Sequence, residues 1–145
     1  MYQTILIASD GTPAAGTTVA HGISLADEFG ASLVALYVIE ILPSGFPSQS
    51  LHSIAQVDEL RRDGADIVNR ISAKAAKTGI RCETSVRNGS VPEEIVACAS
   101  KADVDAIVMG TSRRRRIGNR FLGQTTEQVV RTANVPVLVV PHATE

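Results

Sequence analysis

The chain has 145 residues, which is enough for one domain with its own hydrophobic core, and we expect a single domain over residues 1–145. Lys and Arg total 14 against 15 Asp and Glu, and this balance points neither to nucleic acid nor to a membrane as a partner. Aromatic residues make up 3% of the chain and tryptophan is absent, which argues against a surface that stacks nucleic-acid bases.

The sequence also lacks the signals of export and of a metal centre. The opening MYQTILIASD becomes acidic too early for a signal peptide, and no apolar run approaches the roughly 20 residues that span a bilayer. Cys82 and Cys98 share no CxxC spacing and the three histidines are scattered, so we expect buried thiols and no zinc site. We therefore expect a cytoplasmic protein.

The first third of the chain predicts a strand, a helix and a second strand. Tyr2–Ser9 contains the apolar run ILIA of a buried strand. Thr12 and Pro13 are placed as the N-cap and first-turn proline of a helix that Gly30 ends. Ser32–Ile39 is continuously apolar, as strands of parallel sheets are.

The middle of the chain predicts a loop, a long helix and a short strand. Glu40–Ser50 is rich in Pro, Ser and Gly and forms a loop. Leu51–Thr78 has apolar residues at helical spacing, and Gly79 ends that helix. Arg81–Val86 alternates weakly, which predicts a third strand at a sheet edge.

The next segment predicts a turn followed by a helix. The Asn-Gly pair at 88–89 turns the chain, and Ser90 with Glu93 forms a candidate capping box for a helix that reaches about Ser100. The helix then leads into a fourth strand at Val104–Met109.

The last part of the chain predicts a helix and a closing strand. Gln124–Ala133 is a helix with Val129 and Val130 facing inward, and Val135–Val140 is the final strand. Alternating strands and helices predict an α/β fold with a doubly wound parallel sheet. Ligands of such sheets bind beyond the carboxyl ends of the strands, where the strand order reverses. If the first and fourth strands are neighbours, Asp10 and Gly110 face each other across that crevice.

A basic loop lies between Gly110 and Gly123 and contains Arg113–Arg116. The helix that follows begins with unpaired backbone N–H groups and the positive end of its dipole, which suits an anion such as phosphate. The alternative interpretation is a solvated basic surface loop.

Five segments resemble the universal stress protein family over essentially the whole chain: ILIASDGTP, LYVIE, MGTS, LGQTTEQVV and VPVLVV. The resemblance implies a single-domain, Rossmann-like fold of five strands in the order 3-2-1-4-5. It also implies a homodimer formed through the last strand, Val135–Val140. In one branch of the family it implies ATP binding in the crevice.

The nucleotide-binding branch carries Gly, two residues, Gly, nine residues, then Gly followed by Ser or Thr. Gly110 and Gly123 match the outer glycines, whereas Arg113 stands at the middle glycine and Gln124 at the hydroxyl position. Glycine there permits positive φ or close approach to phosphate, and arginine does not.

Other groups compensate for these departures. Thr125 and Thr126 offer hydroxyls in the first helical turn, and the N–H groups of Gln124 and Thr125 do not depend on side chains. The guanidinium groups of Arg113–Arg116 have forked donors suited to phosphate oxygens.

The resemblance assigns roles to several crevice residues. It places Ala8 and Ser9 beside the base through backbone groups, Val38 against the adenine and Ser112 beside the phosphates. Asp10 is expected to bind ribose hydroxyls, or phosphate through Mg²⁺; its alternative role is to cap the following helix. The predicted nucleotide-binding residues are Ala8, Ser9, Asp10, Val38, Met109, Gly110, Ser112, Arg113, Gly123, Gln124, Thr125 and Thr126.

We therefore expect a homodimeric regulatory protein of the universal stress response that binds ATP, with nucleotide ordering the 40–50 and 110–123 loops for an unknown protein partner. No predicted crevice residue forms an acid–base or nucleophilic pair, so catalysis is limited to slow ATP hydrolysis at most. The alternative is a dimeric stress protein that binds no nucleotide and contacts an acidic protein or nucleic acid through Arg113–Arg116. A weak ATPase is the third hypothesis.

Overall fold

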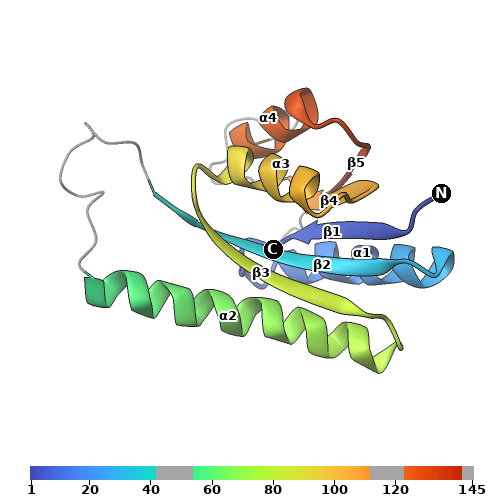
Figure 1. Ribbon diagram of the computed structural model, residues 1–145, viewed down its shortest axis with the longest axis horizontal. Coiled ribbons are helices and arrows are strands. Elements are labelled where there is room, and N and C mark those ends of the chain that lie inside the picture. The colour runs from blue at the N-terminus through green and yellow to red at the C-terminus, as the bar shows by residue number, and fades with distance from the viewer. Residues whose placement is uncertain (42–53, 112–122, 142–145) are drawn as a thin grey trace.

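The protein is described by a computed structural model at residues 1–41, 54–111 and 123–141. The strands are β1 (Thr4–Ala8), β2 (Ser32–Glu40), β3 (Cys82–Gly89), β4 (Ala106–Gly110) and β5 (Val137–Val140), and the helices are α1 (Ala15–Phe29), α2 (Ile54–Lys77), α3 (Val91–Lys101) and α4 (Gln124–Thr132). All neighbouring strands pair in parallel, in the order β3-β2-β1-β4-β5. The predicted α/β fold and its strand order are confirmed (Figure 1).

Helices cover both faces of the sheet, which explains why β1 and β2 are apolar along their length (Figure 1). Ile5, Leu6 and Ile7 are fully buried on β1. Side chains of α1 and α2 join one hydrophobic cluster, and those of α3 and α4 join a second cluster on the opposite face.

The strand order reverses between the central strand β1 and its neighbour β4. Ala8 at the end of β1 is in register with Leu36 of β2 on one side and Met109 of β4 on the other. The predicted adjacency of the first and fourth strands is therefore correct. The connections diverge here, so a crevice can open between the two strand ends.

The start of α1 differs from the prediction for Thr12. The α-helix begins at Ala15, and the preceding turn is closed by hydrogen bonds from Ala15 N to Thr12 O and from Gly16 N to Pro13 O. The i to i+3 span of these bonds is that of a tight 3₁₀-like turn, which places Thr12 before the N-cap position. The end of α1 was predicted correctly, because Gly30 adopts the left-handed conformation with φ 66°.

The segment between β3 and α3 also differs from the prediction. The predicted turn at 88–89 is the end of β3, in register with Ile39 and Glu40 of β2. Ser90 does occupy the N-cap of α3 but makes no side-chain capping hydrogen bond, so the capping box is wrong. The backbone satisfies this turn instead, since Glu94 N donates to Ser90 O.

Two predictions of burial are wrong as well. Val130 is 47% exposed, whereas its neighbour Val129 is fully buried. Successive residues of a helix are about 100° apart around its axis, so the narrow buried face of α4 holds Thr126 and Val129 and excludes Val130. Cys98 is buried as predicted, but Cys82 on the edge strand β3 is only partly buried.

Several predicted features lie outside the described residues. They are the loop from residue 42 onward, the start of the long helix at Leu51, and the basic loop with Ser112, Arg113 and the run to Arg116.

Candidate functional site

The carboxyl ends of β1 and β4 form the centre of the candidate site. Ala8 lies beside Met109 in the sheet, and Ser9 continues the pairing because its N–H donates to Leu36 O at 3.1 Å. The chain leaves the sheet after Ser9. Asp10 follows the end of β1 and Gly110 is the last residue of β4, so both lie at neighbouring strand ends.

Asp10 is exposed and organises the loop between β1 and α1. Its Oδ1 accepts hydrogen bonds from Thr12 N at 2.9 Å and from Thr12 Oγ1 at 2.7 Å. Ser9 Oγ accepts a further bond from Gly11 N at 3.1 Å. One carboxylate oxygen of Asp10 is therefore engaged in a local turn before α1. Asp10 does not cap the helix itself, whose N-cap is Ala14 with no side-chain capping bond.

Two hydrogen bonds fix the start of α4 to the end of β4. Gly123 N donates to Thr111 O at 2.8 Å, and Thr126 Oγ1 donates to Gly110 O at 2.8 Å. Thr126 has no exposed surface. The hydroxyl of Thr126 therefore joins helix to strand, and this contact holds both ends of the basic loop in place.

The first turn of α4 presents backbone donors at this position. Gly123 is the N-cap, with φ −66° and ψ 161°, and as a glycine it has no side chain with which to cap the helix. The N–H groups of Gln124 and Thr125 come too early in the helix to find an intrahelical acceptor. Gln124 is exposed and Thr125 is partly buried, so these donors lie close to the surface. The geometry suits an anion.

Val38 and Met109 belong to the hydrophobic cluster on the α3 and α4 face. Val38 is 8% exposed and Met109 is 3% exposed, and Ala8 packs against the same cluster. Their packing role is clear from this burial. Ser112 and Arg113 lie outside the described residues.

Two residues near the site were not singled out from the sequence. Tyr37 precedes Val38 and points to the opposite face of β2. Partial burial is the main cause that raises the pKa of Tyr37, and the negative charges of Asp10 and Asp63 raise it further. Strand alternation was the available signal for Tyr37. Thr111 contributes through its backbone carbonyl, for which the sequence carries no signal.

Other chemistry in the described ranges is limited. Within residues 1–41, 54–111 and 123–141, no group of His, Cys, Asp and Glu side chains is arranged to hold a metal ion. Burial raises the pKa of both the Cys82 and the Cys98 thiol, which disfavours the reactive thiolate form. Among the same residues, no helix combines the length and apolar character needed to cross a membrane.

The amino-acid sequence has clear relatives. The chain is 31% identical over 141 residues to the universal stress protein MJ0531 of Methanocaldococcus jannaschii, covering 97% of this chain and 82% of that protein. It is 32% identical over 142 residues to a universal stress protein of Thermus aquaticus, covering 97% of this chain and 99% of that protein.

Solved structures share the fold. The hypothetical protein MJ0577 superposes with a TM-score of 0.81 at 24% identity, covering 100% of this chain and 99% of that chain. A universal stress protein in complex with cAMP gives a TM-score of 0.74 at 21% identity, covering 98% of both chains. The universal stress protein of Archaeoglobus fulgidus in complex with dAMP gives 0.68 at 20% identity, covering 95% of this chain and 97% of that chain.

The match extends to the family as a whole. The model of the universal stress protein family covers residues 1–141, nearly the full length of the chain. Together with the strand order and the two curated relatives, this match shows that the chain belongs to the universal stress protein family.

Proposed function

We propose that this universal stress protein binds an adenine nucleotide, with ATP as the ligand, in the crevice at the carboxyl ends of β1 and β4. The phosphates contact the first turn of α4, and the ribose faces the loop that Asp10 organises. The observation that carries the proposal is the start of α4 at a glycine N-cap, fixed against the end of β4.

The start of α4 supports phosphate binding for electrostatic reasons. The N–H groups of Gln124 and Thr125 and the positive end of the helix dipole favour negative charge at one place. Gly123 carries no side chain that would fill the space in front of them. The bond from Thr126 to Gly110 aligns these donors before a ligand arrives, so little ordering remains to be done on binding.

Relatives of the same fold support the class of ligand. One universal stress protein of this fold was solved with cAMP and another with dAMP, and both ligands are adenine nucleotides. We infer the same class here and extend it to ATP, because Ser112 and Arg113–Arg116 in the following loop supply further phosphate-binding groups.

A regulatory role fits the crevice better than catalysis. Its described polar side chains include one carboxylate, and Asp10 Oδ1 is already bonded to Thr12. A Mg²⁺ ion would therefore arrive with the nucleotide, held by the phosphates and water with Asp10 as a single protein ligand, where it would neutralise phosphate charge. Bound nucleotide then acts as a signal to a protein partner.

We also propose that the protein is a cytoplasmic homodimer, joined through β5. This strand is the edge of the sheet, so one row of its backbone groups has no strand partner among the described residues. Leu138 on β5 is 41% exposed and Val137 and Val139 are partly buried, which provides an apolar surface for a second copy.

Titration calorimetry with ATP and Mg²⁺ tests the proposed nucleotide site. The variant Gly123→Val should weaken binding at least about tenfold, because its side chain stands in front of the α4 donors. The φ of −66° at Gly123 suits any residue, so this variant should fold. Gly16→Val is the matched control, since an added Cβ on the exposed Gly16 meets no atom within 4 Å.

The outcomes separate the hypotheses. No heat with ATP at millimolar concentration would overturn the ATP proposal, and tight binding of AMP alone would correct the ligand. Equal affinities for the Gly123 and Gly16 variants would show that nucleotide binds elsewhere. Turnover of ATP at rates of ordinary enzymes would contradict the regulatory role.

A further inference from the structure

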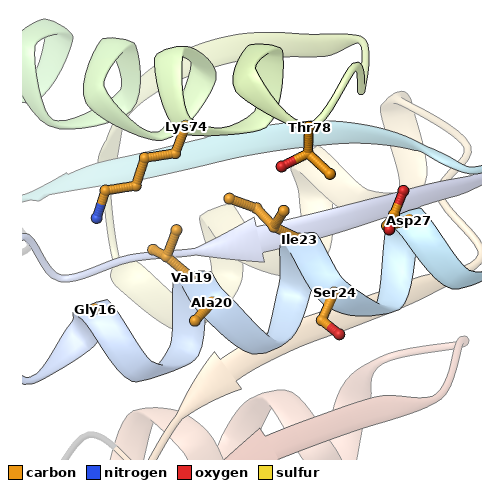
Figure 2. Close-up of a pocket in the computed structure, with 8 residues that line it drawn as sticks. All are labelled: Gly16, Val19, Ala20, Ile23, Ser24, Asp27, Lys74 and Thr78. Atoms are coloured by element: carbon orange, nitrogen blue, oxygen red, sulfur yellow. The ribbon is translucent and has the colours of Figure 1, made fainter.

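A groove runs between α1 and α2 on the face of the sheet that these helices cover. Two adjoining hollows of about 420 and 450 Å³ form it, and they share Gly16, Val19 and Lys74. Figure 2 shows one of them, with Lys74 of α2 and Thr78, the residue after α2, projecting toward α1. We call this feature the α1–α2 groove.

The walls of the α1–α2 groove differ in character. Three cationic side chains of α2 line it, Arg70, Lys74 and Lys77, against one carboxylate, Asp27 of α1. None of the three cations forms an ion pair with another residue in the part of the chain that the structure describes. The apolar lining includes Val19, Ile23, Ile67 and Ile71, of which Ile23 and Ile67 are partly exposed.

We propose that the α1–α2 groove docks an extended acidic segment of a partner protein, in which carboxylates alternate with apolar side chains. Carboxylates would pair with the α2 cations, and apolar side chains would cover the hydrophobic lining. This proposal does not rest on the nucleotide site, because its cations come from α2 and the groove excludes the start of α4. One end of the groove reaches Ser9 and Thr12 in the loop that Asp10 organises.

The spacing of the cations supports an extended peptide. Arg70 and Lys74 are about 6 Å apart along the helix axis, at 1.5 Å per residue. Side chains on one face of an extended chain repeat at about 6.6 Å, which is close to that spacing. Lys77 continues the row by about 4.5 Å, within reach of its long side chain.

The groove suits a peptide better than a nucleic acid or a single phosphate. Among the residues that the structure describes, no aromatic side chain lines either hollow, so they offer bases no stacking surface. A lone phosphate would engage only part of a row of cations that extends over about 10 Å of α2. Apolar residues along the same groove match a partner that brings apolar side chains as well as charge.

Fluorescence anisotropy with a defined probe tests the proposal. The probe is a fluorescein-labelled peptide in which glutamate and leucine alternate, and the companion probe alternates lysine with leucine. We expect saturable binding of the glutamate peptide only. The double variant Arg70→Glu with Lys74→Glu should weaken it at least about tenfold, since attraction is replaced by repulsion.

The matched control reverses two cations elsewhere on the same helix. Arg61 and Arg62 are exposed on α2 and line neither hollow, so the double variant Arg61→Glu with Arg62→Glu should keep the affinity within about twofold. The substituted residues of both double variants are exposed, and circular dichroism checks that both variants fold. Amide shifts in ¹⁵N NMR spectra should concentrate along α1 and α2 when the glutamate peptide is added.

Several outcomes would overturn the proposal. They are absent binding, equal binding of the lysine peptide, equal loss in both double variants, and amide shifts confined to α3 and α4. An oligouridylate that displaces the glutamate peptide at similar charge would assign the groove to nucleic acid and reject the peptide.

Discussion

Thr126 and Gly110 are joined by a hydrogen bond of 2.8 Å, in which the buried hydroxyl of Thr126 donates to the carbonyl oxygen of Gly110. The bond links the end of β4 to the first turn of α4 across the basic loop. Gly123 N supplies a second link to Thr111 O. The start of α4 is therefore joined to the end of β4 by groups outside the arginine run.

The variant Thr126→Val removes this link and keeps the side-chain shape. We expect a loss of about 1–3 kcal/mol in the free energy of unfolding, because the Gly110 carbonyl loses its partner in a partly buried place. Urea denaturation measures this loss. Thr126→Ser retains the hydroxyl, and Thr125→Val changes a partly buried residue with no such bond. A loss in the free energy of unfolding for Thr126→Val no larger than that for Thr125→Val would contradict the role of the bond.

Two glycines of α1 should respond in opposite ways to alanine. A Cβ on Gly22 would lie 2.4 Å from Ile7 Cδ1, and Ile7 is fully buried, so Gly22→Ala forces the core apart and should destabilise the protein by about 1–3 kcal/mol. A Cβ on Gly16 meets no atom within 4 Å, so Gly16→Ala should stabilise by about 0.5–1 kcal/mol through helix propensity. Thermal and urea unfolding of the pair test this. The same sign for both changes would refute the packing argument.

Asp105 should make stability depend on pH in the acid range. Its Oδ2 accepts hydrogen bonds from Gln3 N at 2.8 Å and Thr4 N at 3.0 Å, and these bonds lower its pKa below the ordinary value of 3.8. A lowered pKa stabilises the fold above the unfolded value, and the contribution is lost as pH falls through the folded pKa. Protonation of the Asp105 carboxylate therefore contributes to the loss of stability at low pH, which is the acid arm of the curve of stability against pH.

The variant Asp105→Asn should flatten that acid arm below about pH 4, since the amide does not titrate. Urea unfolding at a series of pH values measures the effect, and NMR titration of the Asp105 carboxyl gives its pKa directly. Glu28→Gln removes an exposed carboxylate of α1 as the control. An unchanged acid arm in Asp105→Asn would contradict the assignment.

Two ion pairs should differ in strength because their exposure differs. Arg87 Nε and Glu94 Oε1 are 2.7 Å apart, with side chains 28% and 26% exposed. Arg131 and Glu127 are 2.9 Å apart on α4, with side chains 72% and 58% exposed. Double-mutant cycles to alanine should give a coupling of about 1 kcal/mol for the first pair and about 0.3 kcal/mol for the second. Equal couplings would show that exposure does not decide the difference.

The proposed dimer predicts a response at β5. Leu138→Glu places a charge on the exposed side chain of the edge strand and should give monomers. Sedimentation velocity measures the change. Ala97→Glu on the exposed face of α3 is the matched control and should leave the dimer intact. A monomeric parent protein, or an intact dimer in Leu138→Glu, would refute the β5 interface.

Much of the candidate site could be predicted from local sequence. Strand β1 ends just before Ser9 and Asp10, and Gly123 precedes a helix, because buried apolar runs and helix starts have sequence signals. For Asp10 the alternative to ligand contact was a cap on the following helix, whereas its carboxylate accepts two hydrogen bonds from Thr12 before the helix starts. The hydroxyl of Thr126 was expected to face a ligand, and its burial against Gly110 depends on how α4 docks on β4.

By itself the amino-acid sequence determined the alternation of strands and helices and the residues that follow each strand, because hydrophobic periodicity and glycine positions act within a few residues. The family resemblance supplied the strand order. Only the tertiary structure decided that Val130 is exposed and that Arg70 and Lys74 of α2 line a groove with α1. These features depend on contacts between segments far apart in the chain, and local patterns carry no record of such packing.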